Sequence, residues 1–487
     1  MSASISILFV TPEVAPWIKT GGLGDVSSAL PAALVALNCE VFILLPAYRS
    51  LRRLLSDAEE AAQIPERGGL PATKVMQIVL PSGVRLLLLD APTFYDRPGG
   101  PYQNEAGKDW ADNDLRFGCL SHAAAWIATH GLLDGWRPQL LHCHDWQAGL
   151  APAYLRFDSP PKTKVATVFT IHNLAFQGLF PASSLARLGL PPESFGVDGL
   201  EYYGQLSFLK GALQYADAIT TVSPTYASEI QQAELGFGMN GLLHARRDVL
   251  HGITNGIDIE EWNPATDRHL ASPYDSDRLG RKAANKAALQ KRMGLPLDDA
   301  IPLFAAVSRM TSQKGTDLIM SIAPRLRLLP SQLVLLGSGE ADLEQGAMAL
   351  AASHPKSVAV KIGFDESLAH LIEAGADFFL MPSRFEPCGL NQMYSQRYGT
   401  PPIARATGGL ADTVVDATPE NIASGRASGF LFAKPEADDL FSAVQRAIRV
   451  YDNPANWARL RQTAMQRDFS WTASALRYRA LFAELIV

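Results

Sequence analysis

The sequence predicts an α/β protein made of two Rossmann-like, doubly wound parallel-sheet domains. The chain has 487 residues, which is too long for one compact core and suits two domains of roughly two hundred residues each. Short apolar runs alternate with helix-like segments along most of the chain, as in successive βαβ units. The glycine-rich segment 20–25 (TGGLGD) nearly recurs as 407–412 (TGGLAD). We therefore expect one similar strand–loop–helix unit in each half.

The composition is that of an ordinary globular protein, with 47% hydrophobic and 19% charged residues. A net charge of -6 provides no general attraction to nucleic acid or to anionic lipid. The expected partner is therefore small or neutral, with no nucleic acid and no membrane.

Cysteine usage and hydropathy indicate a cytoplasmic protein. The four cysteines, Cys39, Cys119, Cys143 and Cys388, are scattered without a CxxC pair, which argues against a disulfide framework and a zinc site. No apolar run approaches the length of a membrane span. An apolar strand begins within a few residues of the N-terminus, so we expect no signal or transit peptide.

The first half opens with a buried parallel strand at 5–10, a glycine-rich loop and a helix at 26–37. The loop, 19–25, could bring backbone N–H groups and the ammonium of Lys19 to a phosphate. It matches neither the dinucleotide fingerprint nor a Walker loop, so a simple tight turn is the alternative. Further strands are expected at 41–45, 86–89, 140–142, 165–169 and 218–222.

Histidines follow two of these expected strands. His142, His144 and Asp145 come after one strand, and His172 with Asn173 comes after the next. Ligands of such sheets bind at the carboxyl ends of the strands, so the His-Asn pair favours a position in the ligand cleft over a purely structural role. The pattern lacks a zinc signature and further nearby ligands, so we expect no metal site.

A segment at 252–258 closes the first half. The polar stretch that comes next, 260–291, is interpreted as a connector with a surface helix, and the second half begins after it. A buried strand at 302–307 ends in a loop with Arg309 and Lys314. Two cations five residues apart on such a loop could bind a diphosphate, although solvated surface cations are common. Further strands are expected at 333–339, 358–362, 378–381, 402–404 and 429–432, and a last helix at 473–487.

The stretch 382–398 (PSRFEPCGLNQMYSQRY) predicts a turn that leads into a helix. The N–H groups of Gly389, Leu390 and Asn391 would face outward at the helix start, which suits an anion such as phosphate. Glu386 would repel phosphate, so its expected partner is the neutral end of the ligand, such as sugar hydroxyls. The alternative is a solvated glutamate on an ordinary connection.

Eight motifs in register along the chain resemble bacterial glycogen synthases and the similar starch synthases. These motifs are KTGGLGDV, HDWQAGLAPAYL, FTIHNLAFQG, VSPTYASEI, NGIDIEEWNP, SRMTSQKGTDL, SRFEPCGLNQMYSQRYGT and ATGGLADTV. The families they resemble are retaining glucosyltransferases of the GT-B type, with two Rossmann-like domains that face a deep cleft. The resemblance implies an N-terminal acceptor-side domain at 1–257, a C-terminal donor-side domain at 258–465 and a helix at 466–487 that crosses back to the N-terminal domain.

The resemblance also implies roles for single residues. Arg309 and Lys314 would contact the donor diphosphate, Glu386 would hold hydroxyls of the transferred glucose, and His172 would lie against the glucose near the reacting carbon. Lys19 would anchor the phosphates, and Phe364 would border the adenine. The full donor-binding set implied by the resemblance is Lys19, Gly21, Gly22, Asp25, Asp145, Asn255, Phe364, Cys388, Gly389, Leu390 and Asn391.

The implied reaction transfers glucose from ADP-glucose to the non-reducing 4-hydroxyl of an α-1,4-glucan with retention, and needs neither cofactor nor metal. A retaining hydrolase uses two carboxylates about 5 Å apart, whereas Glu386 is the one evident candidate here. We therefore expect same-face attack through an oxocarbenium-like state. The alternatives are a transferase that uses UDP-glucose and a non-catalytic glucan-binding relative.

One position departs from the wider GT-B pattern. Many relatives have a second glutamate eight residues after the first, and this chain has Tyr394 there. Bacterial glycogen synthases share this departure, which leaves the contacts to the ribose unassigned.

Overall fold

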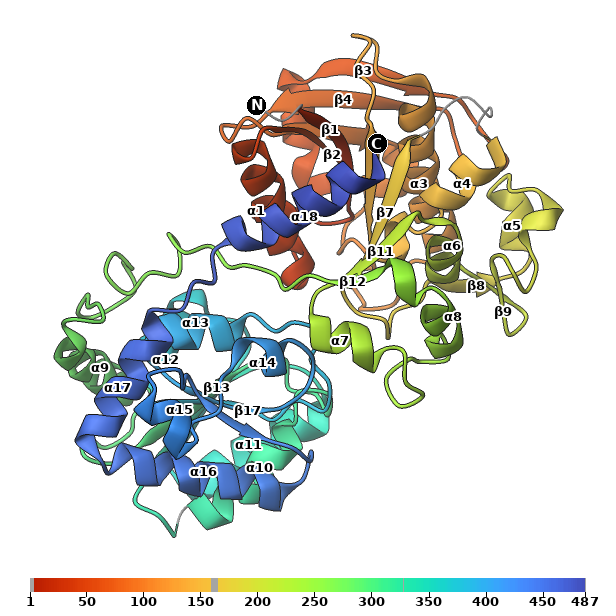
Figure 1. The fold of residues 1–487 in the computed structure, drawn as a ribbon. Coiled ribbons are helices and arrows are strands. Elements are labelled where there is room, and N and C mark those ends of the chain that lie inside the picture. The colour runs from red at the N-terminus through yellow and green to blue at the C-terminus, as the bar shows by residue number, and fades with distance from the viewer. Residues whose placement is uncertain (1–3, 159–164, 327, 487) are drawn as a thin grey trace. The chain divides into compact units, whose positions relative to one another are not determined.

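The computed structural model describes residues 4–158, 165–326 and 328–486. The chain folds into two compact units, which we call unit 1 (Met1–Gly256 with Trp471–Val487) and unit 2 (Ile257–Ser470). Figure 1 shows the path of the chain through each unit. Ile257 is the first residue of unit 2, and its N–H donates to Phe469 O, in the same unit, at 2.8 Å. The domain ranges that follow from the resemblance stay a prediction.

Unit 1 is built on a nine-stranded sheet with the order β12-β11-β7-β6-β1-β2-β5-β4-β3. All neighbouring strands run parallel except for the pairs β3–β4 and β4–β5, which are antiparallel. The order reverses direction at β1, so the crevice beside it is the expected ligand position of a doubly wound sheet. The strands are β1 (Ile5–Val10), β2 (Cys39–Pro46), β3 (Glu59–Ile64), β4 (Thr73–Val79), β5 (Arg85–Asp90), β6 (Leu140–His144), β7 (Ala166–Ile171), β11 (Ala218–Thr221) and β12 (Leu250–Gly252).

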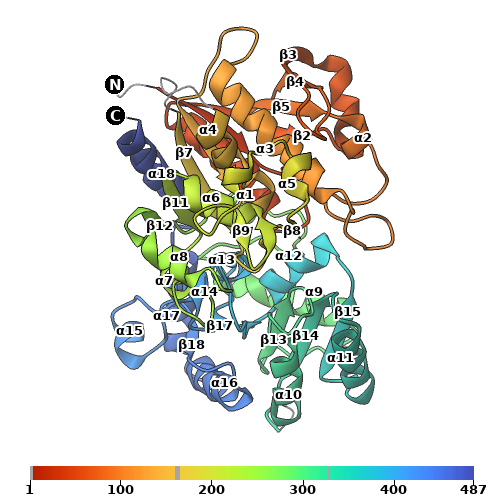
Figure 2. The same ribbon diagram turned by 90° about the vertical axis from the view of Figure 1, so that its right-hand side faces the viewer.

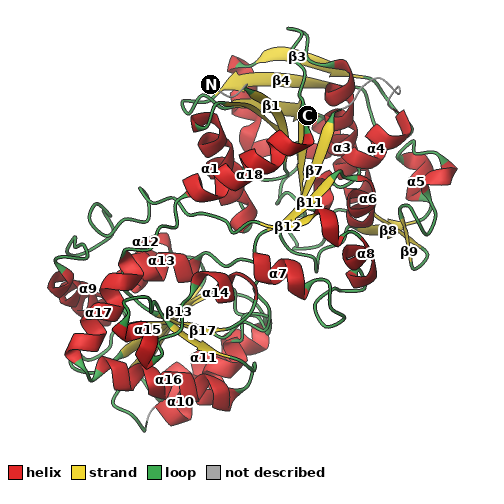
Figure 3. Ribbon diagram, in the orientation of Figure 1, coloured by secondary structure: helices red, strands yellow, loops and turns green. Residues whose placement is uncertain are grey.

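Helices surround this sheet, and a small antiparallel sheet lies among them (Figures 2 and 3). The small sheet has the order β8-β10-β9, with β8 (Leu179–Pro181), β9 (Glu201–Tyr202) and β10 (Gln205–Ser207). The helices of unit 1 are α1 (Gly22–Ala36), α2 (Pro92–Tyr95), α3 (Asn113–His130), α4 (Ala151–Asp158), α5 (Ser184–Arg187), α6 (Phe208–Tyr215), α7 (Pro224–Glu229), α8 (Asn240–Ala245) and α18 (Trp471–Leu485). Short 3-10 helices lie at Arg49–Asp57, Trp146–Ala148, Pro192–Ser194 and Arg247–Val249.

The last helix, α18, packs on unit 1, as the sequence predicts. It lies beside α1 (Figure 1), and the guanidinium of Arg479 donates to Leu37 O at 2.9 Å. The rings of Tyr478 and Phe482 lie against His142, each with centroids 5.4 Å apart. Helix α18 therefore packs on the sheet that contains β1.

Unit 2 contains a fully parallel six-stranded sheet with the order β15-β14-β13-β16-β17-β18. Side chains alternate between its faces: Phe304 and Ala306 pack in one core cluster with α10 and α16, and Leu303 and Ala305 pack in another with α9 and α12. Both faces are thus covered, and the predicted doubly wound class is confirmed for both units. The strands are β13 (Leu303–Val307), β14 (Gln332–Gly337), β15 (Val358–Ile362), β16 (Phe378–Met381), β17 (Pro402–Arg405) and β18 (Phe430–Phe432).

The helices of unit 2 are α9 (Lys282–Arg292), α10 (Thr316–Leu326), α11 (Ala341–Ser353), α12 (Glu366–Gly375), α13 (Asn391–Arg397), α14 (Gly408–Thr413), α15 (Pro419–Ala423), α16 (Ala437–Tyr451) and α17 (Pro454–Met465), with a 3-10 helix at Leu279–Arg281. Across the described parts of both units, no helix has the length and apolar character needed to cross a membrane.

The expected surface helix of the 260–291 stretch is α9, and the face that it buries contains lysines. Lys282 is buried, and its ammonium donates to Ala374 O at 2.7 Å, to Glu373 O at 3.1 Å and to Thr400 Oγ1 at 2.7 Å. Two of these acceptors are carbonyls at the C-terminal end of α12, where a cation is favourable. Burial lowers the pKa of Lys282 to about 7. The charge pattern did not reveal this burial, because the ammonium of Lys282 donates to buried backbone carbonyls instead of facing solvent.

We predict that Lys282→Met lowers the melting temperature of the protein. The change leaves buried carbonyl oxygens without a donor, which costs roughly 1–3 kcal/mol. Lys291→Met is the matched control, because Lys291 lies on the same helix and is exposed. Differential scanning calorimetry compares the two variants, and equal melting temperatures would contradict a structural role for the Lys282 ammonium.

Candidate active site

In unit 2, the sheet order brings two loops together. β13 and β16 are neighbouring strands, and the strand order reverses direction between them. A doubly wound sheet binds ligands at this switch point. The loop after β16 carries Glu386, which is 4% exposed. Its Oε2 accepts from Lys314 Nζ at 2.6 Å and from Ser383 Oγ at 3.0 Å. Two residues that the sequence singled out separately therefore form an ion pair, in which the carboxylate is buried and the lysine is partly exposed.

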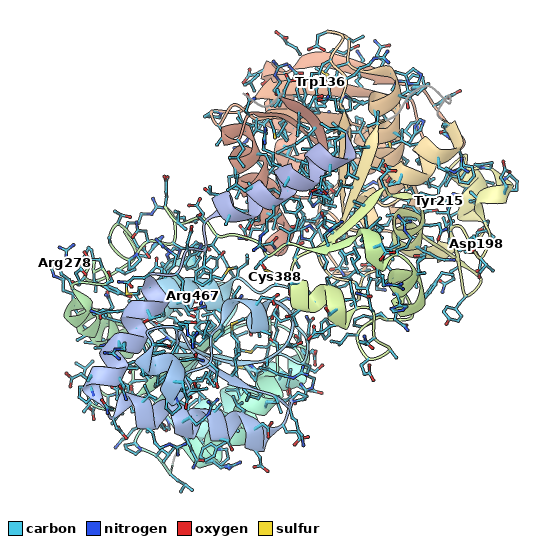
Figure 4. All side chains as sticks on the ribbon, in the orientation of Figure 1. Trp136, Asp198, Tyr215, Arg278, Cys388 and Arg467 are labelled. Carbon is cyan, nitrogen blue, oxygen red and sulfur yellow. The ribbon has the colours of Figure 1, made fainter. Side chains whose placement is uncertain are left out.

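The second glycine motif supports the Glu386 loop. Gly408 has φ +43°, and a Cβ at this position would lie 1.9 Å from Glu386 O. A Cβ on Gly409 would lie 2.1 Å from Cys388 O, and the Gly409 N–H donates to Glu386 O and Pro387 O, both at 3.2 Å. Cys388, labelled in Figure 4, is buried on the same loop. This motif holds the loop by close backbone approach, which only glycine permits.

The loop after β13 is locked to the same turn. Gly315 has φ +72°, and a Cβ there would lie 2.3 Å from Pro382 O. The N–H of Arg384 donates to Gln313 O at 2.8 Å, and its guanidinium binds both carboxylate oxygens of Asp317, at 2.8 and 2.7 Å. These contacts fix the position of Lys314 relative to Glu386.

Groups able to bind an anion lie on these loops. The backbone N–H groups of Gly389, Leu390 and Asn391 have no hydrogen-bond partner among the described residues, and the Asn391 side chain donates to Val307 O at 2.6 Å. The guanidinium of Arg309 is exposed, as is the ring of Phe364, which is 86% exposed. Arg309 and Phe364 are thus available to solvent rather than packed in the core.

In unit 1, the last residue of β6, His144, and the residue just after β7, His172, form a hydrogen-bonded pair. His144 Nδ1 lies 2.9 Å from His172 Nε2, and the backbone N–H of His172 donates to Asp145 Oδ1 at 2.7 Å. β6 extends through His144, two residues beyond the end of the expected strand, so that His144 is a strand residue rather than a loop residue. Burial lowers the pKa of His172 to about 3 and raises that of Asp145 to about 7. The imidazole of His172 is therefore neutral at pH 7.

The glycine loop of unit 1 is organised around an acid that the sequence analysis missed. Glu13 is buried, and its carboxylate accepts from the Thr20 N–H at 2.6 Å, from the Thr20 hydroxyl at 2.5 Å and from the Tyr102 hydroxyl. Lys19 Nζ pairs with Asp25 Oδ1 at 2.7 Å. Glu13 lies just past the end of β1, and this position at the carboxyl end of a strand could have revealed it.

The other predicted residues of unit 1 lie on the same strand-end loops. Gly21 precedes α1, and Gly22 is its first residue, so the helix begins four residues earlier than its sequence pattern predicts. Asn255 lies after β12, and its buried Oδ1 has no hydrogen-bond partner in the described part of the chain. The roles of all these residues in ligand binding stay predictions.

Among the described residues, one cluster has ligand types suited to a metal ion. Glu261, Glu366 and His370, in unit 2, offer atoms that all lie within 4.8 Å of one another. His370 already pairs with Asp267 at 2.7 Å. Burial alone lowers the pKa of His370, but its hydrogen bonds to Asp267 and Glu366 raise it to about 9. Because the imidazole is protonated at neutral pH, the cluster is best described as a network of ion pairs.

Comparisons with known proteins agree with this architecture. Residues 6–245 match the family model described as the starch synthase catalytic domain, and residues 289–463 match glycosyl transferases group 1. The glycogen synthase of Aromatoleum aromaticum is 53% identical over 484 residues, which cover 99% of this chain and 98% of the relative. The glycogen synthase of Nitrosomonas eutropha is 52% identical and covers 99% and 97%. This chain belongs to the glycogen synthase family.

Solved structures confirm the fold of this family member. The catalytic domain of starch synthase IV from Arabidopsis thaliana, bound to ADP and acarbose, has a TM-score of 0.86 and 32% identity, with 100% of both chains covered. Anabaena HepE, in complex with UDP and glucose, has a TM-score of 0.57 at 16% identity over 99% of this chain and 100% of its own, a likeness that concerns the fold alone. The chain is a GT-B glycosyltransferase, as its motifs predict.

We predict that Gly408→Ala lowers both the melting temperature and the transferase activity. The new Cβ would overlap Glu386 O and push the loop away, at a cost of roughly 1–3 kcal/mol for overpacking. Gly425→Ala is the control, because Gly425 also has a positive φ, +66°, but its Cβ would meet nothing within 4 Å. Equal effects of the two changes on calorimetry and activity would contradict the supporting role of Gly408.

Proposed function

We propose that this glycosyltransferase transfers glucose from ADP-glucose to the non-reducing 4-hydroxyl of an α-1,4-glucan, with retention of the α configuration. The observation that carries the proposal is the ion pair between Lys314 and the buried carboxylate of Glu386, on the same loops as the N–H groups of residues 389–391. The carboxylate of Glu386 is suited to bind sugar hydroxyls, whereas the ammonium of Lys314 and the N–H groups are suited to bind a diphosphate. All of these groups lie at the switch point of the unit 2 sheet. The glycogen synthase names of the relatives and the ADP bound to starch synthase IV support the donor and the acceptor.

Lys314 has a double role in this proposal. Its ammonium neutralises the buried carboxylate of Glu386, so that the donor phosphates are not repelled. Together with Arg309 and the backbone N–H groups, it stabilises the negative charge that develops on the leaving diphosphate, which is usually the largest catalytic effect in such a site. Because these protein cations supply the positive charge, the reaction needs no metal ion.

Glu386 acts by holding hydroxyls of the glucose rather than as a nucleophile. Its carboxylate is engaged by Lys314 and Ser383 on the same oxygen, Oε2, and the other oxygen is left to accept hydrogen bonds from the sugar. Double displacement needs a second carboxylate about 5 Å from the first, and none of the residues assigned to the site supplies one. We therefore assign same-face attack, in which the leaving diphosphate takes the proton of the acceptor hydroxyl.

In unit 1 we assign His172 to the sugar and Lys19 to the phosphates. A neutral His172 does not repel the positive charge that develops at the reacting carbon. His144 and Asp145 position it through the two contacts at 2.9 and 2.7 Å. The exposed ring of Phe364 offers a stacking surface for a purine base. We expect the enzyme to work in the cytoplasm, where its four cysteines, which form no disulfide bond among the described residues, stay reduced.

The test is a donor assay with purified protein and a short maltooligosaccharide. We predict that labelled glucose from ADP-glucose appears in longer α-1,4-linked products, that UDP-glucose is a poorer donor, and that EDTA leaves the rate unchanged. Nuclear magnetic resonance of the product identifies the anomer. A β linkage, free glucose as the main product, preference for UDP-glucose or loss of activity with EDTA would each contradict part of the proposal.

A further inference from the structure

Unit 2 contains an open cavity beside the end of α17. Its volume is about 570 Å³, which lies within the usual range of small-molecule sites. The residues that line it come from α15, from α17 and from the segments beside these helices, and all of them belong to unit 2. The Lys314–Glu386 site contributes no lining residue. The cavity is therefore a second place in this unit at which a ligand could bind.

One wall of the cavity carries an arginine whose charge is not neutralised. Arg467, labelled in Figure 4, is partly buried. Its Nε is buried without a hydrogen-bond acceptor, and the part of the chain that the structure describes holds no ion-pair partner for its guanidinium. Burial lowers the pKa of Arg467. The guanidinium carbon lies 5.4 Å from the ring centroid of Phe469, a contact that orients the planar group.

The carboxylates that lie beside the cavity in the sequence are engaged elsewhere. Asp468 directly follows Arg467, and its Oδ1 accepts from the Ser470 N–H at 2.8 Å. Asp416 precedes α15, and it pairs with Arg446 at 2.9 Å. Neither acid compensates the lost hydration of the Arg467 guanidinium. A bound anion would provide this compensation.

Arg426 supplies a second guanidinium to the same cavity. Its Nε donates to Ser424 Oγ at 3.1 Å, and its Nη2 donates to Asn421 Oδ1 at 3.2 Å. Both acceptors are neutral, so the charge of Arg426 is not cancelled by them. The backbone N–H groups of Arg426 and Ala427 donate to Asn421 O, at 2.9 and 3.1 Å. These bonds fold the segment back onto α15 and hold Arg426 at the cavity.

The remaining lining is neutral and mostly polar. Thr463 and Gln466 lie three residues apart at the end of α17, on one face of the helix. Their side chains make no hydrogen bond within the described ranges of the chain. Val415 adds an apolar surface, and a Cβ on Gly425 would meet nothing within 4 Å. This lining suits a ligand that has hydroxyls and C–H groups in addition to negative charge.

We propose that the cavity binds a small sugar phosphate. A phosphate monoester carries nearly two negative charges at neutral pH, which matches the guanidiniums of Arg426 and Arg467, and arginine binds phosphate oxygens through charge-assisted hydrogen bonds. Thr463 and Gln466 bind the sugar hydroxyls. A cavity of about 570 Å³ is far larger than a phosphate ion requires. The site goes beyond the proposed function and shares no residue with it.

Isothermal titration calorimetry with ribose 5-phosphate tests this proposal. The compound lacks the glucose ring that Glu386 holds in the proposed function. We predict that Arg426→Gln and Arg467→Gln each raise the dissociation constant by roughly tenfold, because each change removes charge-assisted hydrogen bonds to the phosphate. Arg449→Gln is the matched control: Arg449 is an exposed arginine of α16 that does not line the cavity, so its loss should leave the dissociation constant unchanged.

A further variant separates loss of the site from loss of structure. Thr463→Glu places a carboxylate four residues before Arg467, a spacing that favours an ion pair on a helix. We expect this variant to lose ribose 5-phosphate binding and to melt at the same or a higher temperature, because an internal anion takes the place of the phosphate. Wild-type affinity in Thr463→Glu, or lost binding together with a lower melting temperature, would contradict the assignment.

Other results would overturn the proposal in recognisable ways. Equal weakening by Arg449→Gln would mean that binding follows general surface charge. Inorganic phosphate that binds as tightly as ribose 5-phosphate would mean that the sugar is not recognised. Binding that is lost in Arg309→Gln and kept in Arg426→Gln and Arg467→Gln would place the ligand at the donor loops. A protein that binds ribose 5-phosphate as predicted and transfers no glucose would refute the proposed function and leave this site intact.

Discussion

The ion pair between Lys314 and Glu386 is the interaction on which the candidate site depends. A carboxylate that is 4% exposed is stable only when a partner compensates the loss of hydration, and removal of Lys314 leaves the buried charge of Glu386 unpaired. The pair exists because β13 and β16 are adjacent in the sheet and their loops interlock through Gly315 and Arg384. The sheet topology thus places Lys314 beside Glu386, and the close backbone approach at Gly315 holds their two loops together.

Much of the fold was predictable from the sequence because buried parallel strands are nearly continuous apolar runs. The expected strands at 5–10 and 358–362 have the same ends in the structure. The antiparallel strands β3 and β4 were missed because their charged and polar residues give no apolar run, and β8 to β10 were missed because they have two or three residues each. The burial of Lys282 on α9 was not predicted, because the sequence alone does not show which buried backbone carbonyls need a hydrogen-bond donor.

The residues of the candidate site were predictable where they lie just after the end of a predicted strand. Glu386, Lys314 and His172 lie on loops that follow apolar runs directly, so the sequence alone is enough to locate these loops. Glu13 and Tyr102 are 89 residues apart, and their contact depends on how the chain folds back. The same limit applies to the cavity beside α17, because the sequence does not reveal that Arg426 and Arg467 line one cavity.

The most direct test of the central claim is a double-mutant cycle on Lys314→Ala and Glu386→Gln, measured as kcat and KM for ADP-glucose. If the pair acts as one unit, each single change lowers kcat by roughly 10²- to 10³-fold, as for the loss of a group that stabilises transition-state charge, and the double variant loses little more than either. Glycogen binding should remain intact in all three. Additive losses, or an equal fall in kcat and in glycogen affinity, would contradict the account.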